Sequence, residues 1–370
     1  MPSTTRIHLL GDINLLGVDD PAVPFNKIAP VLKAADAVFA NLECCLFDPA
    51  EKREMMRDDQ SGVEGIYAPP ASGAALKHAG VQVIGNANNQ NYGADAILAS
   101  NRRLDELGIA HAGTGVNKTA ACAPVIIERN GLKIGFIQRT SQYWPNNHEA
   151  GERATGVAAM KAYTAYQPPY YKDNKIPPNR PGAPAKVITW VDADYLAELK
   201  ADIVALKNQC DIVIASHHWG YGEEILQYQR ELAHAAIDAG ADIVMGHGPH
   251  FPLAIEFYKS KPVYYGLGMC CFIRSNKKAH RGWTGMAAHL TFENKSLVEA
   301  AFSIVRQNDA GEVLFSSAQI ESDAIARVEK LSQVFGTQLS VDGARVRVTG
   351  AYVRTLRALE LRLSSVKLIQ

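Results

Sequence analysis

The chain has 370 residues, of which 47% are hydrophobic and 21% charged, and its 38 basic side chains balance 38 acidic ones. This length predicts a large core in one big domain or two ordinary ones. The even charge argues against a nucleic-acid partner, which would need a clustered basic face. No apolar run approaches about 18 residues and no apolar leader follows the start, so we expect no membrane association and a cytoplasmic location.

Strand-like apolar runs alternate with helix-like segments in the first third of the chain. The expected strands are 7–10, 37–40 and 81–84. The expected helices are 25–35, 70–79 and 96–107. Gly80 and Gly108 directly follow the last two helices, as is typical of helix C-termini. The alternation predicts a layered α/β sheet.

The middle of the chain adds a hairpin and two more strands. Asn130-Gly131 separates the runs 125–128 and 133–137, and this dipeptide favours a type I′ turn. The sheet is therefore expected to contain an antiparallel pair. Further along, the expected elements are strands at 210–215 and 242–245, a helix at 226–239 between them and a helix at 322–335.

Two segments interrupt this pattern. Residues 141–185 are rich in tyrosine and proline, and a long aromatic excursion of this kind predicts a lid over a functional site. Residues 51–64 form a charged loop, from which Arg53 is expected to contact an anionic substrate. A basic helix is expected to end the chain.

Polar side chains stand at the end of each expected strand. They are Asp12, Asn14, Glu43, Asn88, Asn89, His218, His247 and His250. Because open α/β sheets bind ligands at the carboxyl ends of their strands, we expect these groups to share one pocket. Clustered imidazoles near carboxylates indicate either a metal site or acid/base chemistry. Oxygen and imidazole ligands without cysteine suit Mn, Fe or Zn in a two-metal hydrolase.

Seven short blocks in a fixed order carry a family resemblance. They are GDINLLG (11–17), NLE (41–43), ANN (87–89), GTGVN (113–117), HWG (218–220), GHGPH (246–250) and YYGLG (264–268). Together they resemble the CapA family of capsule or poly-γ-glutamate synthesis proteins. The resemblance implies an α/β fold, a layered metallophosphatase-like sandwich of mixed sheets flanked by helices. We expect this domain to span 1–305, with 306–370 as a C-terminal extension packed on it.

The resemblance also implies roles for individual residues. Asp12 would hold one divalent ion and Glu43 would bridge two. Asn89 and His218 would hold the second ion, and His247 and His250 would complete the ligand set. The remaining expected site residues are Glu223 as an acid or base, and Asn14, Asn88, Gln90, Trp219 and Arg53 around the substrate.

Four positions depart from the family pattern. Gln90 replaces a histidine that resembles the proton donor of metallophosphatases, and glutamine cannot transfer a proton at neutral pH. Gly248 replaces a second histidine, Met269 an asparagine and Gly93 an aspartate. All four lie near the expected site, so we expect altered chemistry or altered use of metal.

Three functions remain open from the sequence. The first is a metal-dependent hydrolase that cleaves a phosphoester or an amide or peptide bond with a metal-activated water. The second is a metal-free peptide or amino-acid epimerase, in which Asp12 and either His247 or His250 face each other across a Cα–H. The third is an accessory role in polyglutamate or capsule assembly. A small-molecule or peptide substrate is expected, and the oligomeric state stays open.

Overall fold

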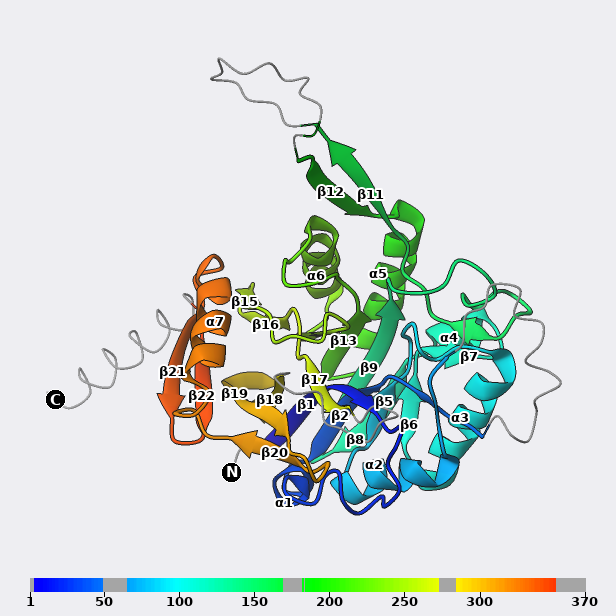
Figure 1. Cartoon of the computed structure of the whole chain (residues 1–370). Coiled ribbons are helices and arrows are strands. Elements are labelled where there is room, and N and C mark those ends of the chain that lie inside the picture. Colours follow the sequence, from blue (N-terminus) through cyan, green and yellow to red (C-terminus); the bar gives the residue numbers. More distant parts are fainter. Residues whose placement is uncertain (1–2, 49–64, 169–181, 183, 273–283, 351–370) are drawn as a thin grey trace, which may run out of the picture.

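The computed structural model describes residues 3–48, 65–168, 182, 184–272 and 284–350. Two mixed β-sheets lie face to face between layers of helices, which gives a layered α/β sandwich (Figure 1). The expected fold class, mixed sheets flanked by helices, is therefore confirmed.

The larger sheet has ten strands, with both parallel and antiparallel neighbours. Its main order is β21 (Gln338–Asp342), β22 (Arg345–Thr349), β19 (Ser296–Gln307), β18 (Gly285–Glu293), β1 (Thr4–Asn14), β2 (Ala37–Leu42), β5 (Val83–Gly85) and β6 (Ala110–Ala112). Beside this path, β17 (Met269–Phe272) pairs with β1, and β20 (Val313–Ser316) pairs with β19. The run from β1 to β6 is parallel, so the carboxyl ends of these strands share one edge.

The smaller sheet has six strands. Their order is β15 (Ile255–Tyr258), β16 (Lys261–Tyr264), β14 (Ile243–His247), β13 (Ile212–His218), β9 (Leu132–Thr140) and β8 (Val125–Arg129). Asn130 and Gly131 join β8 to β9 with φ values of 51° and 76°, as the predicted hairpin turn requires. Strand β13 runs parallel to both β9 and β14, so its carboxyl end also meets theirs.

Apolar side chains from both sheets fill the space between them. Phe39 of β2 stacks on Phe136 of β9, with the ring centroids 5.4 Å apart. The preceding residue of β2, Val38, points the other way and packs with the helices on the outer face. Since side chains alternate along a strand and both faces are covered, these strands are apolar almost throughout.

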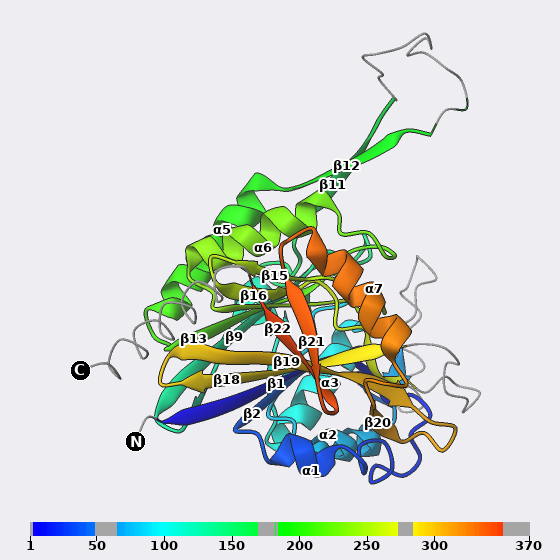
Figure 2. The ribbon, with the colours of Figure 1, turned by 90° about the vertical axis from the view of Figure 1, so that its left-hand side faces the viewer.

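Helices cover the two outer faces (Figure 2). On the larger sheet lie α1 (Ala29–Lys33), the 3₁₀ turn η3 (Pro70–Gly73), α2 (Ala74–Ala79) and α3 (Ala94–Leu107). On the smaller sheet lie α5 (Ala193–Lys207) and α6 (Gln227–Ala239). The expected helix at 25–35 shrinks to α1, because Pro30 allows a helix to begin there but not to run through it.

Three pairs of short strands complete the described part of the chain, together with the short helix α4 (Lys118–Cys122). They are β3 (Cys45–Leu46) with β4 (Tyr67–Ala68), β7 (Thr114–Gly115) with β10 (Gly156–Val157), and β11 (Ala162–Gln167) with β12 (Lys186–Val191). The β11–β12 ribbon points away from the sandwich (Figures 1 and 2). Within 141–185, strand β11 therefore pairs with β12 and not with the strands that carry the site, so this part gives no support to the predicted lid. Residues 169–181 and 183 of the segment lie outside the described residues.

The expected C-terminal extension joins the main body. Strands β20 and β22 both pair with β19, and helix α7 (Ser322–Gln333) packs near β15. Just after α7, Phe335 stacks on Tyr265 with the ring centroids 5.5 Å apart. Residues 351–370, where a final basic helix was expected, lie outside the described residues. In the described part of the chain, no helix has both the length and the apolar character that a membrane crossing needs.

Candidate metal centre at the strand ends

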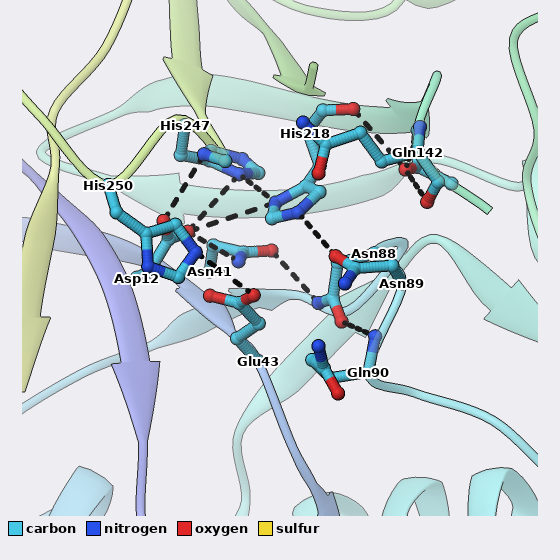
Figure 3. A network of polar contacts seen from close by, with 12 residues as sticks. Asp12, Asn41, Glu43, Asn88, Asn89, Gln90, Gln142, His218, His247 and His250 are labelled. Carbon is cyan, nitrogen blue, oxygen red and sulfur yellow. Dashed lines mark hydrogen bonds and ion pairs between the residues drawn. The ribbon is translucent and has the colours of Figure 1, made fainter. Parts of the chain in front are cut away.

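Both sheets deliver polar groups to the same place. Asp12 comes near the end of β1 and Glu43 directly follows β2, while His218 and His247 end β13 and β14 (Figure 3). The parallel register sets His218 opposite His247, and it sets Asp12 opposite Asn41. The facing edges of the sandwich thus bring together groups from distant parts of the chain, as the strand-end pattern predicted.

Gly11 allows the backbone at Asp12 to pack directly against Gly268. The Asp12 N–H donates to the Gly268 carbonyl at 2.9 Å. A Cβ atom on the preceding residue, Gly11, would lie 1.9 Å from that same carbonyl oxygen, so no larger side chain fits there. The Gly-Asp pair therefore fixes the position of the Asp12 carboxylate against the loop before β17.

Asp12 and two histidines form the first candidate ligand group. Asp12 Oδ1 lies 3.5 Å from His247 Nδ1 and 3.8 Å from His218 Nδ1, and the two Nδ1 atoms are 3.0 Å apart. The Asn41 side-chain amide donates to Asp12 Oδ1 at 2.8 Å, and the Gly248 N–H donates to Oδ2 at 3.2 Å. All three ligand side chains are fully buried.

Asp12, Glu43 and His250 form the second candidate group. His250 Nε2 lies 3.3 Å from Glu43 Oε1, and the other Glu43 oxygen, Oε2, is buried without a hydrogen-bond partner among the described residues. In each group the ligand atoms all lie within 4.8 Å of one another. Asp12 belongs to both groups, so in this geometry Asp12 is the shared carboxylate, whereas the family resemblance implied Glu43.

Burial sets the protonation of the cluster. Burial, followed by the nearby Glu43 carboxylate, raises the pKa of Asp12 to about 8. Burial also holds the pKa values of His218 and His247 well below 6.5, and the neighbouring imidazoles push them in the same direction. The two imidazoles are therefore neutral at physiological pH, which is the form that can coordinate a cation. A divalent ion would offset the rise at Asp12 by favouring its charged form.

A buried amide network supports the ligands from behind. Gln138, near the end of β9, donates from Nε2 to Asn41 Oδ1 at 3.0 Å, and its Oε1 accepts the Ala87 N–H at 2.7 Å. Gln138 was not among the expected site residues, because the strand was expected to end at residue 137. The signal was present, since Gln138 is a polar residue directly after an apolar run, like the other site residues.

The expected substrate residues near this cluster have structural partners. Asn14 donates to the Glu43 carbonyl at 3.0 Å, and Asn88 donates to the Leu42 carbonyl at 2.8 Å, so both shape the loop that holds Glu43. Asn89, which was expected to be a metal ligand beside His218, has its Oδ1 2.9 Å from His218 Nε2. Gln90 is half-buried, and its backbone N–H donates to Asn88 Oδ1 at 3.1 Å (Figure 3).

Two predicted site residues lie apart from the cluster. Trp219 is fully buried, stacks on His217 and Tyr265, and donates to the Tyr265 carbonyl at 2.9 Å, so it belongs to the core and cannot form a substrate wall. Glu223 is exposed and pairs with Arg327 of α7 at 2.9 Å, outside both ligand groups. Arg53 lies outside the described residues.

Part of the tyrosine- and proline-rich segment does reach the site. Trp144, which is 38% exposed, donates from Nε1 to the Asn89 carbonyl at 3.0 Å. His148 accepts the Trp144 N–H at Nδ1, and its Nε2 lies 2.9 Å from the Asn91 carbonyl. The segment 141–150 is therefore held against the loop after β5. The partly exposed Trp144 lies beside Asn89 at the rim of the site, whereas Trp219 had been expected to form a wall for the substrate.

Fold and site together define a layered α/β protein with clustered carboxylate and imidazole groups at its strand ends. The model of the bacterial capsule synthesis protein PGA_cap family matches residues 8–272. The chain belongs to this family, which confirms the resemblance drawn from the sequence blocks.

Individual relatives fit that assignment. Uncharacterized protein y4sH of Sinorhizobium fredii is 29% identical over 281 residues, covering 66% of this chain and 60% of that protein. Capsule biosynthesis protein CapA of Bacillus anthracis is 25% identical over 75% of this chain and 58% of its own length. A probable polyglutamine synthesis accessory protein of Mycobacterium tuberculosis is 42% identical over 77 residues, 20% of each chain. The chain thus spans about 60% of the length of the first of these relatives.

Proposed function

We propose that this chain is a metal-dependent hydrolase of the CapA type, acting on a phosphoester or on an amide or peptide bond. The observation that carries the proposal is the pair of carboxylate–imidazole groups that share Asp12. The names of its relatives support a place in polyglutamate or capsule assembly. The substrate is then a small molecule or peptide of that process.

The donor set suits two ions of Mn, Fe or Zn. Asp12, His218 and His247 would hold one, and Asp12, Glu43 and His250 would hold the other. The orphaned, buried Glu43 Oε2 supports this fit, since a buried carboxylate oxygen without a partner is costly unless a cation or water satisfies it. When bound, two such ions supply an activated water and polarise the bond to be cleaved.

The protein's own groups set the limits of the reaction. Asn41 and the Gly248 N–H hold the Asp12 carboxylate in place, and burial of the imidazoles keeps water out of their side of the site. Gln90 can hydrogen-bond a leaving group but cannot protonate it. Of the proposed bonds, this favours a phosphoester whose leaving group departs without a strong acid beside it over an amide, whose amine leaves only after protonation.

Metal analysis tests the proposal. We expect about two equivalents of Mn, Fe or Zn per chain in the purified protein, loss of hydrolytic turnover with EDTA, and recovery on adding metal back. Asp12→Asn should lose bound metal. Glu256→Gln is the matched control, because Glu256 also pairs with a histidine, His234 at 3.0 Å, but lies outside both groups. Full turnover in metal-free protein would refute the proposal.

One observation favours a second candidate, a metal-independent epimerase. Burial raises the pKa of Asp12 to about 8, so near neutral pH this carboxyl can hold a proton while the buried His247 imidazole stays neutral, which places one acid and one base in the same pocket. The two groups lie 3.5 Å apart, so they would have to separate to flank a substrate Cα. Such an enzyme would incorporate deuterium from heavy water into a peptide or amino-acid substrate with EDTA present. Absence of that exchange would reject this candidate.

A further inference from the structure

The two ring nitrogens of His247 face opposite sides. Nδ1 points into the candidate metal centre, 3.5 Å from Asp12 Oδ1 and 3.0 Å from His218 Nδ1. Nε2 points to the rear, where Ser216 Oγ lies at 2.8 Å and Gln138 Nε2 at 3.3 Å. The imidazole and the Ser216 side chain are both fully buried. Which nitrogen carries the proton therefore depends on these few neighbours.

The orientation of the Gln138 amide is fixed by a backbone group. The Ala87 N–H donates to Gln138 Oε1 at 2.7 Å, so the atom that faces His247 is the amide nitrogen, which can only donate. Without an ion, His247 Nε2 is then an acceptor and its proton sits on Nδ1, toward His218 Nδ1. His218 in turn carries its proton on Nε2, 2.9 Å from the Asn89 Oδ1 acceptor.

A cation in the site requires the opposite arrangement. Coordination by His247 Nδ1 needs a lone pair there, so the proton must move to Nε2. Of the two described groups that face Nε2, Gln138 offers only a donor, whereas the Ser216 hydroxyl can either donate or accept. Metal-binding histidines ordinarily give their second N–H to such an outer acceptor, and its loss weakens metal affinity by roughly 10- to 100-fold.

We propose that Ser216 is a positioning residue that permits His247 to switch tautomer and present Nδ1 to a divalent ion. This inference rests on the proposed metal-dependent function. With metal absent, the Ser216 hydroxyl donates a hydrogen bond to Nε2; with metal bound, the hydroxyl rotates and its oxygen accepts a hydrogen bond from Nε2–H. The Gln138 amide nitrogen can only donate to His247 Nε2, so it favours the metal-free tautomer. Ser216 offsets this preference, because its hydroxyl can also accept a hydrogen bond from Nε2–H.

Zn²⁺ titration by calorimetry tests this role against a matched control. The Ser216→Ala protein should bind Zn²⁺ about 10- to 100-fold more weakly than the wild type. Ser303→Ala is the control, because Ser303 Oγ makes the same kind of contact, at 3.0 Å from His289 Nε2. His289 of β18 and Ser303 of β19 lie diagonally on neighbouring strands, outside both ligand groups, so this variant should bind Zn²⁺ like the wild type.

A ¹⁵N NMR spectrum of the histidine rings shows which ring nitrogen carries the proton. A loss of packing alone would not change this tautomer. The His247 signals, assigned with His247→Gln, should show Nδ1–H without metal and Nε2–H with Zn²⁺. Unchanged affinity in Ser216→Ala, beside a wild type that binds Zn²⁺, would overturn the role of Ser216 and leave the proposed function intact. A wild type that binds no Zn²⁺, Mn²⁺ or Fe²⁺ would overturn both.

Discussion

Two pairs of buried histidines in this protein have different neighbours. His218 and His247 lie beside Asp12 at the strand ends, whereas His8 and His289 pack edge to face inside the larger sheet, with ring centroids 4.4 Å apart. Burial lowers the pKa in both pairs. Arg345 lowers the pKa of both His8 and His289 further, and among the described residues only the first pair belongs to a group with a carboxylate that could hold a cation.

This difference shows that burial alone makes an imidazole neutral but does not make a ligand site. Where carboxylates converge on neutral imidazoles, the protein gains attraction for a divalent ion. Where no carboxylate lies near, the buried imidazole is only a core residue, and its protonation opposes folding. The predictions below test this contrast at each kind of site.

The largest effect is expected from removing a histidine of the first pair. His218→Ala removes a proposed ligand itself. It should therefore reduce Zn²⁺ affinity by more than the roughly 100-fold that follows from losing a group that only hydrogen-bonds a ligand. His289→Ala should leave affinity unchanged and reduce stability instead, since it leaves a cavity in the core. Calorimetric titration and urea unfolding of both variants check this. Equal loss of Zn²⁺ binding in both variants would break the comparison.

The second pair should make folding sensitive to acid. Burial, followed by the charges of Arg345 and Arg6, lowers the pKa of His8 from 6.5 to about 4. The unfolded chain therefore takes up this proton first, so the stability is complete above about pH 7 and falls as the pH drops from 6.5 toward 4. The shift corresponds to about 3 kcal/mol at most. His8→Gln should make this slope shallower in urea unfolding between pH 7.5 and 5, while His218, His247 and His289 keep their own contributions, and an unchanged slope would contradict the assignment.

A smaller effect is expected at Gln90, where the site departs from the family pattern. Gln90→His restores a group able to give a proton to a leaving oxygen. With diphenyl phosphate, whose phenolate leaves more readily when a proton is supplied, and Mn²⁺, kcat should rise by about tenfold, below the 10²–10⁴ of an optimised acid. The kcat should also acquire a pH dependence near the histidine pKa. No change would indicate that residue 90 does not face the leaving group.

The smallest effect should come from the rim. Trp144→Ala should raise KM for the same substrate by a few-fold at constant kcat, because the indole lies beside the Asn89 loop but touches no ligand. Trp190→Ala is the matched control, since Trp190 is 40% exposed but belongs to the β11–β12 ribbon. Equal effects of the two variants would contradict a rim role for Trp144.

Local signals predicted much of the fold. Gly80 and Gly108 end helices α2 and α3 with φ values of 83° and 71°, and Asn130-Gly131 forms the expected hairpin turn. These features depend on the backbone freedom of one or two residues, which a sequence shows directly. The ribbon β11–β12 was not predicted, because its pairing joins segments separated by the prolines that made the region look irregular.

The sequence by itself determined which groups gather at the strand ends, because strand order and polar strand ends are local patterns with a known geometric consequence. Tertiary structure alone decided which residues form the two candidate ligand groups and that Asp12 belongs to both. It also placed Trp219 in the core and paired Glu223 with Arg327. It also brought Gln138 and Ser216 behind His247. The reason is physical: such contacts depend on side-chain direction and on the approach of two separate sheets, which no spacing along the chain encodes.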